Sequence, residues 1–362
     1  MRLSRIDIAD FRCIEAARLE FGSGCNLIEG PNGSGKTSLL EAIGFLSRGR
    51  SFRGTRTDGL VRHGAGQFTV AGRVLEAGRE HRLGIEAGRG HLVVRVNRQP
   101  ADSLAVLAEK LAVQVIDPEI HRLVSDGPEV RRRFLDYGVF HVEHAFLDAW
   151  RRYRRALRQR NAGLREGIDD EVLRAWEPEL IATGRTVDGL RRQHLGALAE
   201  EFVVLGRQLT GAEVGCEYRS GWGEAPEFEQ ALEAARERDR EQGTTTVGPH
   251  RADLRLIYRG RSARQQVSRG QQKLFGAALV LAQTRAMARE RTEGPVLLVD
   301  DPAAELDGDS LERLMAGVLG TGSQLIVTAL TTDAVSLPAE TVMFHVEHGR
   351  VSAAANSAQD TE

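Results

Sequence analysis

Apolar and polar residues alternate through the first third of the chain in the way that β-strands require. Residues 1–29 show this period of two, and residues 66–98 and 113–116 repeat it. A helical spacing of apolar residues from 37 to 46 separates the first two segments, and a short helix is expected at 101–108. Strands that alternate with helices predict an α/β domain.

The pattern becomes helical near residue 118. Apolar residues recur at helical spacing from 129 to about 209, with Pro178 as an expected break, and again from 227 to 242. The apolar heptads are not sustained, so no long coiled coil is expected. Residues 118–242 therefore predict a mostly helical lobe.

Strand patterns return after Gly243. The fully apolar run Val296–Val299 is typical of a strand that is buried on both faces of a parallel sheet. Further strands are expected at 252–258, 325–327 and 342–344, and further helices at 268–289 and 311–318.

These segments predict a discontinuous domain organisation. We assign residues 1–117 and 243–352 to one α/β domain, and residues 118–242 to a helical lobe that is inserted into it. The small, polar tail 353–362 is expected to be flexible. A chain of 362 residues is long enough for two such domains.

Composition narrows the class of protein. The chain is 41% hydrophobic and 28% charged, as in water-soluble globular proteins. A net charge of −2 gives no overall sign of a polyanionic partner, so any nucleic-acid surface must be a local patch. No apolar run is long enough to span a membrane. Three distant cysteines, Cys13, Cys25 and Cys216, indicate a reducing, cytoplasmic compartment.

One octapeptide carries the clearest chemistry. It fits the pattern G-x-x-x-x-G-K-[ST] of a phosphate-binding loop and consists of Gly30, Pro31, Asn32, Gly33, Ser34, Gly35, Lys36 and Thr37. A strand pattern precedes it and a helical pattern follows, which disfavours a chance glycine-rich turn. Its backbone N–H groups would surround the phosphates of a nucleoside triphosphate, Lys36 would reach the β- and γ-phosphates, and the Thr37 hydroxyl would ligate Mg²⁺.

A second motif closes the apolar strand at 296–299. Asp300 comes at the end of this strand, where it would hold Mg²⁺ together with Thr37. The next residue, Asp301, is placed to polarise an attacking water. The alternative is a simple Asp-Pro turn, because Pro302 follows. Lys36, Asp300 and Asp301 are therefore the candidate catalytic residues.

A third motif opens a predicted helix before that strand. Ser268, Arg269, Gly270 and Gln271 resemble the signature motif of ABC-type ATPases, although the usual family form has Gly at the position of Arg269. The resemblance implies a segment that reaches across a dimer to the γ-phosphate of the partner's nucleotide. The alternative is an ordinary helix with a serine cap.

Smaller elements extend this resemblance. Asp307 stands in a stretch similar to the D-loop, and Thr328 lies where many members place a switch histidine. Gln114 resembles the Q-loop residue that senses magnesium, and Arg12 resembles the nucleotide-proximal Arg of SMC-like heads. Many ABC proteins have Glu at the position of Asp301, so the resemblance implies slow hydrolysis.

Four segments together resemble the RecF family of bacterial recombination mediators. They are residues 49–53, 131–136, 247–254 and 268–271, in this order, and the resemblance covers roughly residues 1–350. It implies a P-loop, ABC-type ATPase head with a helical second lobe and no long arm. It also implies ATP-dependent homodimerisation, binding of gapped single-strand/duplex DNA, weak DNA-stimulated ATP hydrolysis, and work with RecO and RecR to load RecA.

A run of arginines offers a surface for DNA. The candidate contacts are Arg131, Arg132, Arg133, Arg151 and Arg155, whose charges could neutralise phosphates without reading sequence. Alternatively, they form a solvated helix face or pair with the acids at 169–171. The repeated His-Val-Glu-His at 141–144 and 345–348 invites a metal site, but we expect coincidence, because the two copies fall in different secondary structure.

Two other functions share the phosphate loop. One is an SMC-type ATPase head that organises DNA mechanically, and it is disfavoured because the chain lacks a long coiled coil. The other is the ATPase subunit of a transporter, which would dock on a membrane partner through a much smaller helical insertion.

Overall fold

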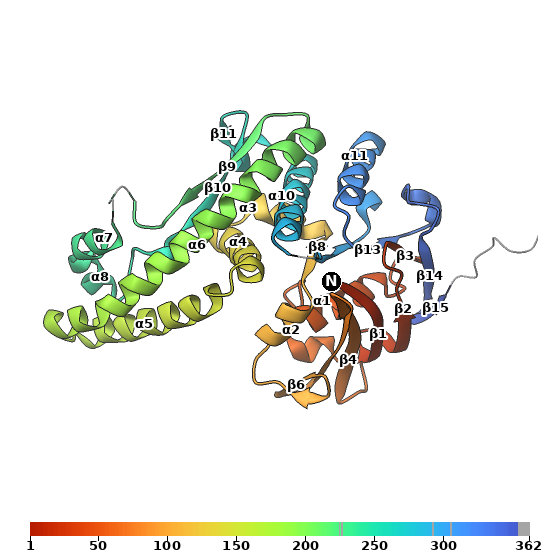
Figure 1. The fold of residues 1–362 in the computed structure, drawn as a ribbon, viewed down its shortest axis with the longest axis horizontal. Coiled ribbons are helices and arrows are strands. Elements are labelled where there is room, and N and C mark those ends of the chain that lie inside the picture. Colours follow the sequence, from red (N-terminus) through yellow and green to blue (C-terminus); the bar gives the residue numbers. More distant parts are fainter. Residues whose placement is uncertain (224, 226, 292, 305, 354–362) are drawn as a thin grey trace, which may run out of the picture. The chain divides into compact units, whose positions relative to one another are not determined.

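The computed structural model describes residues 1–353 except 224, 226, 292 and 305. The chain divides into two compact units, Met1–Ile120 with Ala277–Glu362, and His121–Gly276 (Figure 1). The predicted boundary near residue 118 lies close to the first division. The second unit continues to Gly276 instead of ending at 242, because strand Val214–Arg219 pairs with Asp253–Tyr258. The predicted flexible tail lies outside the described residues, apart from Ala353.

The first unit contains a mainly parallel sheet of six strands. Its order is β15-β14-β3-β13-β12-β8, and only β15 is antiparallel to its neighbour. The strands are β3 Cys25–Glu29, β8 Val113–Ile116, β12 Val296–Val299, β13 Leu325–Ala329, β14 Val342–Glu347 and β15 Arg350–Ala353. Because β3, β8, β12 and β13 run parallel, the residues that follow them meet at one edge of the sheet.

A second sheet of six strands in the same unit is antiparallel, with the order β2-β1-β4-β5-β6-β7. Its strands are β1 Arg2–Phe11, β2 Ile14–Glu20, β4 Gln67–Glu76, β5 Arg79–Gly88, β6 His91–Val96 and β7 Gln99–Pro100. Helix α1, Lys36–Arg48, contacts strands of both sheets. Phe11, Phe45 and Phe68 join β1, α1 and β4 through edge-to-face contacts with ring centroids 5.0 to 6.2 Å apart.

The remaining helices of this unit are α2 Ala105–Lys110, α11 Gly308–Leu319 and most of α10 Arg269–Glu290, together with the 3-10 turns Thr57–Leu60, Pro118–His121, Pro302–Ala304 and Thr332–Ala334. Helix α2 begins four residues later than the predicted 101–108, because Gln99–Pro100 still pairs as β7. The Ser103 hydroxyl then accepts a hydrogen bond from the Ala105 N–H at 3.2 Å, which turns the chain into the helix.

The second unit is mostly helical. Its helices are α3 Arg122–Ser125, α4 Pro128–Val142, α5 Phe146–Glu166, α6 Asp170–Thr210, α7 Phe228–Ala234, α8 Arg236–Gln242 and α9 Ala263–Gln266, with a 3-10 turn at Pro249–Arg251. A three-stranded antiparallel sheet completes it, β11 Arg261–Ser262, β10 Asp253–Tyr258 and β9 Val214–Arg219. Helix α6 runs unbroken through Pro178, so the predicted break there is wrong.

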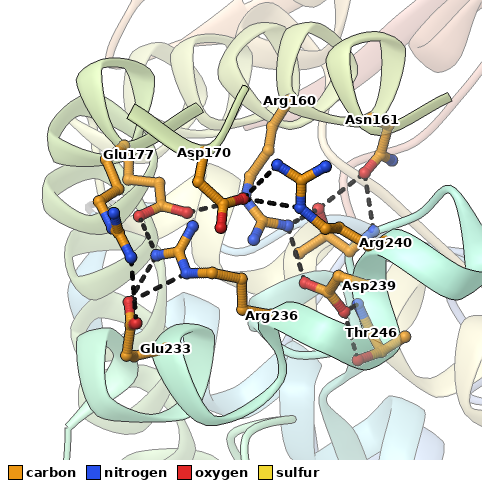
Figure 2. Close-up of polar contacts among 11 residues, drawn as sticks. Arg160, Asn161, Asp170, Glu177, Glu233, Arg236, Asp239, Arg240 and Thr246 are labelled. Atoms are coloured by element: carbon orange, nitrogen blue, oxygen red, sulfur yellow. Dashed lines mark hydrogen bonds and ion pairs between the residues drawn. The ribbon is translucent and has the colours of Figure 1, made fainter. Parts of the chain in front are cut away.

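Helices α5 and α6 form a hairpin that is held by buried ion pairs. Arg160, only 1% exposed, donates to Glu177 at 3.1 Å and to Asp239 at 2.8 Å. Arg236 also donates to Glu177, at 3.1 Å, and Figure 2 shows how these side chains from α5, α6 and α8 point toward one another. Buried charges are tolerated only when they are paired, so this network fixes α8 against the hairpin.

The described residues lack two kinds of feature, a metal-holding cluster of His, Cys, Asp or Glu side chains and a membrane-spanning helix. No group of three or more His, Cys, Asp or Glu side chains that could hold a metal occurs among the described residues, so the two His-Val-Glu-His copies form no such cluster. Within the described part of the chain, no helix combines the length and apolar character that crossing a membrane requires.

Candidate nucleotide-binding site

The loop between β3 and α1 has a backbone that only glycine adopts easily. Gly30, Gly33 and Gly35 have φ values of 155°, 78° and 119°. A Cβ atom at Gly30 would lie 2.2 Å from the carbonyl oxygen of Val346, so no side chain fits there. Gly35 precedes the first residue of α1, which places the loop at the N-terminus of a 13-residue helix. This geometry is typical of phosphate-binding loops.

Polar side chains of the loop point into it. The ammonium group of Lys36, which is 7% exposed, donates to the carbonyl oxygens of Gly30 at 2.6 Å and Pro31 at 3.1 Å. The Ser34 hydroxyl is buried and has no hydrogen-bond partner among the described residues. A buried hydroxyl and an ammonium group are donors that a phosphate would satisfy. The loop therefore fits a nucleoside triphosphate.

Asp300 is held by two threonine hydroxyls. Thr37, in the first turn of α1, donates to the Asp300 carboxylate, with both carboxylate oxygens at 3.0 Å. Thr328, at the end of β13, donates to Oδ1 of Asp300 at 2.8 Å and accepts the Asp301 N–H at 2.9 Å. The three elements that meet here are α1, β12 and β13. The structure thus brings Thr37, Asp300 and Thr328 together. The sequence motifs pair Thr37 with Asp300, whereas the contact of Thr328 with Asp300 was not predicted.

A second carboxylate, which is half-buried, lies near enough to Asp300 to be affected by its charge. Asp117 directly follows β8, which pairs with β12, and burial followed by the charge of Asp300 raises the pKa of Asp117 to about 6. Burial also raises the pKa of Asp300, against the hydrogen bonds from Thr328 and Thr37. Two neighbouring carboxylates in a poorly solvated place fit a divalent cation with oxygen ligands. The sequence motifs do not include Asp117, although it directly follows the predicted strand 113–116.

Arg12 lies in the tight turn between β1 and β2 and is bound to α1. Its guanidinium donates to both carboxylate oxygens of Glu41 at 2.9 Å and to the Thr55 hydroxyl at 2.8 Å. Glu41 is completely buried and also accepts a hydrogen bond from Ser51. Arg12 is therefore held rigidly over the second turn of the helix that begins at Lys36, which is compatible with the predicted place near the nucleotide.

Gln114 does not lie where its predicted role requires. Its side chain is 3% exposed, and its amide donates to Gln283 at 2.7 Å and to the sulfur of Met287 at 3.4 Å, both in α10. Gln114 is the second residue of β8, whereas the site lies at the carboxyl end of that strand. The structure gives no support to a magnesium-sensing Gln114, and Asp117 is the residue of this segment that approaches Asp300.

The candidate signature segment belongs to the second unit and begins α10. The Ser268 N–H donates to the Gln271 side chain at 3.0 Å, and the Gln271 N–H donates to the Ser268 hydroxyl at 3.4 Å. This reciprocal pair is a capping box, so the alternative of a serine-capped helix is present in the structure. Ser268, Arg269 and Gly270 are exposed nevertheless, and the cap leaves them open to contact from outside the chain.

Asp307 caps another helix. Its carboxylate accepts the Ser310 N–H at 2.8 Å at the start of α11, and that hydrogen bond is the main reason why the pKa of Asp307 is lowered. The side chain is exposed. The neighbouring Glu305 of the predicted D-loop lies outside the described residues.

The arginines at 131–133 are not a free basic patch. Arg131 is 8% exposed, is paired with Asp253 at 2.8 Å and donates to the Asp126 carbonyl oxygen at 2.7 Å. Arg132 donates to the Ala252 carbonyl oxygen at 2.7 Å, and Arg133 is paired with Glu129. The prediction that Arg131 contacts DNA is therefore wrong, because β10 brings an acid from 122 residues away to neutralise it.

Residues 131–136 and 247–254, two of the segments on which the resemblance to the RecF family rests, contact each other within the second unit. Asp136 pairs with Arg191 at 2.7 Å, and Arg191 also donates to the Pro249 carbonyl oxygen at 2.7 Å. His250 lies 2.6 Å from the Tyr153 hydroxyl and 3.0 Å from the Thr245 carbonyl oxygen. A carbonyl only accepts, so Nε2 of His250 carries the proton and the Tyr153 hydroxyl donates to Nδ1. Residues 131–136 and 248–253 are thus part of the framework of the second unit.

Helix α5 presents the exposed arginines. Arg151, Arg154, Arg155 and Arg158 are all exposed and follow the spacing i, i+3, i+4, i+7, which places them along one face of the helix. Trp150 lies beneath this face, 6.0 Å from the Arg154 guanidinium. Arg151 and Arg155 therefore remain candidates for phosphate contacts.

Two comparisons define the class of protein. The chain matches the model of the RecF/RecN/SMC N terminal domain over residues 2–352. It also superposes on the Smc head domain of Pyrococcus furiosus with a TM-score of 0.59, covering 97% of this chain and 95% of that chain at 16% identity, which shows the fold alone. With the phosphate loop before α1 and Asp300 after β12, the fold and site define a P-loop ATPase head of the RecF/RecN/SMC type. A transporter subunit is thereby left without support.

Relatives of higher identity identify the family within this class. DNA replication and repair protein RecF of Shewanella pealeana is 38% identical over 357 residues, covering 97% of this chain and 99% of the relative. Its counterpart in Thioalkalivibrio sulfidiphilus is 41% identical over 354 residues, covering 96% and 98%. The solved structure of recombination mediator protein RecF-ATP in the RecFOR pathway superposes with a TM-score of 0.87 at 27% identity, covering 98% of this chain and 97% of that chain. The chain belongs to the RecF family.

Proposed function

We propose that this protein is an ATP-dependent DNA-binding protein of recombinational DNA repair and replication restart. The relatives are named for DNA replication and repair, and the related structure is named for its ATP complex. The observation that carries the proposal is the phosphate loop with Thr37 and Thr328 both bonded to Asp300. It supplies phosphate donors and a carboxylate at one edge of the parallel sheet.

In this proposal, different residues of the site bind the nucleotide and promote its hydrolysis. The loop from Gly30 to Thr37 surrounds the phosphates with backbone N–H groups, and Lys36 adds a positive charge. Thr37 and Asp300 would hold Mg²⁺, which neutralises phosphate charge when it is bound. Asp301 accepts a proton from the attacking water. Because many ABC proteins have Glu at the position of Asp301, we propose a weak, switch-like ATPase.

Thr328 has a different role from the switch residue that its position suggests. It is fully buried and touches both Asp300 and the backbone of Asp301. Its hydroxyl group is thus engaged within the protomer, by one hydrogen bond that it donates and one that it accepts. We assign Thr328 the role of positioning Asp300 and Asp301 relative to each other.

Dimerisation by ATP follows from the exposed ends of two helices. Ser268, Arg269 and Gly270 begin the 22-residue α10, whose N-terminus favours a negative charge. In the proposed dimer, the start of α10 and Asp307 of one protomer contact the nucleotide of its partner. ATP thus joins two surfaces that ADP releases.

DNA lies against α5 in this proposal. The exposed face that Arg151 and Arg155 share with their neighbours has the charge and spacing for phosphate contacts, which are sequence-independent and sensitive to salt. Gapped DNA with a junction of single strand and duplex is the proposed substrate. The name of the RecFOR pathway supports RecO and RecR as partners. The loading of RecA downstream is proposed on the family resemblance alone.

Sedimentation of two variants tests this function. Lys36→Ala should abolish nucleotide binding and ATP-dependent dimerisation together, because the phosphate loop loses its charge. Asp301→Asn should bind ATP and remain dimeric, because hydrolysis no longer ends the engagement. A monomeric Asp301→Asn protein at saturating ATP would refute the proposed dimer.

A further inference from the structure

A basic cavity is built entirely from residues of the second unit. It has a volume of about 300 Å³ and is lined by side chains that include Arg131, Arg219, Asp253, Arg255 and Arg264. These come from α4, β9, β10 and α9. A cavity of this size is at the lower end of sites for small ligands.

The charges around the cavity do not balance. Arg131 is paired with Asp253 at 2.8 Å, and Arg255 lies 3.7 Å from Glu217. Arg219 and Arg264 are exposed and have no hydrogen-bond or ion-pair partner in the described part of the chain. Two guanidinium groups therefore face the cavity without compensation, and a cavity of this kind attracts an anion.

The pairing of β9 with β10 fixes the positions of these charged side chains. Arg219 is directly opposite Asp253 in the antiparallel pair of β9 and β10, and Arg255 is two residues further along β10. Cross-strand partners and residues two apart share one face of a sheet, so Arg219, Asp253 and Arg255 lie on the same face. The buried Arg131 holds Asp253, which keeps this carboxylate from neutralising Arg219.

We propose that this cavity binds a phosphate group, contributed either by a nucleic-acid strand or by a small phosphate compound. Arg219 and Arg264 are the binding residues, and Arg255 supports them. Planar guanidinium groups match phosphate oxygens through paired hydrogen bonds, which makes arginine better suited to this task than lysine. A duplex is too wide for about 300 Å³, whereas one or two phosphates fit.

The site also touches the element that leads to the signature segment. Arg264 lies in α9, Ala263–Gln266. Ser268, two residues after the end of α9, begins the capping box of α10. A phosphate held by Arg264 restrains this short connection. The cavity thus links an anion in the second unit to the segment that we assign to the partner's nucleotide, and this link rests on the proposed function.

Arginine modification tests the site directly. The full-length protein is treated with phenylglyoxal in the presence of pyrophosphate, of gapped duplex DNA or of neither, and each modified arginine is identified by peptide mass spectrometry. Arg219 and Arg264 should be protected, while Arg79 and Arg89, exposed arginines of the first unit, should not. The charge of Arg53 acts on both Asp117 and Asp300, so protection of Arg53 reports the nucleotide site. It is scored separately, and failure there does not affect this proposal.

Matched double variants complete the test in a Lys36→Ala background, which removes binding at the phosphate loop. Arg219→Ala/Arg264→Ala should weaken binding by about tenfold, the loss expected for charge-assisted hydrogen bonds, whereas Arg79→Ala/Arg89→Ala should not. Loss of pyrophosphate binding identifies a small phosphate compound, and loss of DNA binding alone identifies a strand phosphate. No protection by either probe, or equal losses in both double variants, overturns the proposal.

Discussion

At the scale of single residues, the site depends on hydroxyl groups that orient carboxylates. Thr328 is buried, donates to Asp300 and accepts from the backbone of Asp301. Partners of metal-binding carboxylates matter almost as much as the ligands themselves. The site therefore extends beyond the motifs that identify it.

Thr328→Val tests this positioning role, because valine keeps the shape and removes the hydroxyl. We expect the hydrolysis rate to fall about 10- to 100-fold. The unfolding free energy should fall by about 1–3 kcal/mol, since the Asp301 N–H loses its acceptor. DNA-stimulated ATP turnover and urea unfolding measure the two effects. Thr186→Val, an exposed threonine of α6, is the control, and equal turnover in both variants would contradict the role.

Two histidines make the second unit sensitive to acid. His194 is 4% exposed, and burial lowers its pKa to about 4; burial is also the main cause that lowers the pKa of His250 to about 4. Both are neutral in the folded protein, whereas the unfolded chain takes up protons below pH 6.5. Their contribution to stability is thus complete above pH 6.5 and is lost as the pH falls toward 4.

The measurable result is the slope of the unfolding free energy against pH. Each histidine should lower the unfolding free energy by about 1.4 kcal/mol per pH unit in this window. His194→Leu should remove one of these contributions, and urea unfolding between pH 7.5 and 4.5 measures the change. Thr186→Val, at an exposed position without a titratable group, should leave the slope as it is. An unchanged slope in His194→Leu would show that this histidine has the same pKa in the folded and unfolded protein, and would refute the prediction.

At the scale of elements, helix α5 separates structural arginines from exposed ones. Arg160 is buried in the ion-pair network of Figure 2, while Arg155 and Arg158 are exposed on the same helix. The sequence alone does not distinguish the buried arginine from the exposed ones. Which arginine binds DNA is therefore decided by the helix face and by partners from other elements.

Arg155→Ala/Arg158→Ala should weaken binding to DNA of any sequence and leave stability nearly unchanged. The slope of log affinity against log salt should become shallower by about 2, because two phosphate contacts are lost. Fluorescence anisotropy at several salt concentrations measures this slope. Arg131→Met is the contrasting variant: it should destabilise the protein by about 3 kcal/mol, because Asp253 loses its buried partner, and it should leave the two phosphate contacts of α5 in place. The reverse outcome would move the DNA surface to α4.

The same elements show how far the sequence could lead. The phosphate loop, Asp300 and the strand Val296–Val299 were predictable, because local spacing determines all three. The role of Arg131 was not, since its partner Asp253 is distant in sequence and comes near only when β10 forms. Asp117 was missed for a similar reason: its place beside Asp300 follows from the pairing of β8 with β12.

At the scale of the whole molecule, the proposed function needs two protomers for each nucleotide. The phosphate loop and the exposed start of α10 belong to different units of the chain. Lys36 supplies one half of the proposed composite site, and Ser268 of the partner supplies the other. The arrangement predicts complementation between two inactive variants.

Lys36→Ala and Ser268→Arg should each be inactive alone, because every homodimer lacks one half at both sites. In an equimolar mixture, the heterodimer has one site with both Lys36 and Ser268 intact and one site with neither. Random pairing would make half of the dimers mixed, so one quarter of the ATP turnover per chain of the unaltered protein is the upper limit of the recovery. The recovery should fall below this limit, because Lys36→Ala leaves the mixed dimer with ATP at only one of its two sites. A mixture of Lys36→Ala with Asp301→Asn is the control, since both changes fall on the same half and no site is restored. No recovery in the first mixture would mean that each chain builds its reaction centre alone.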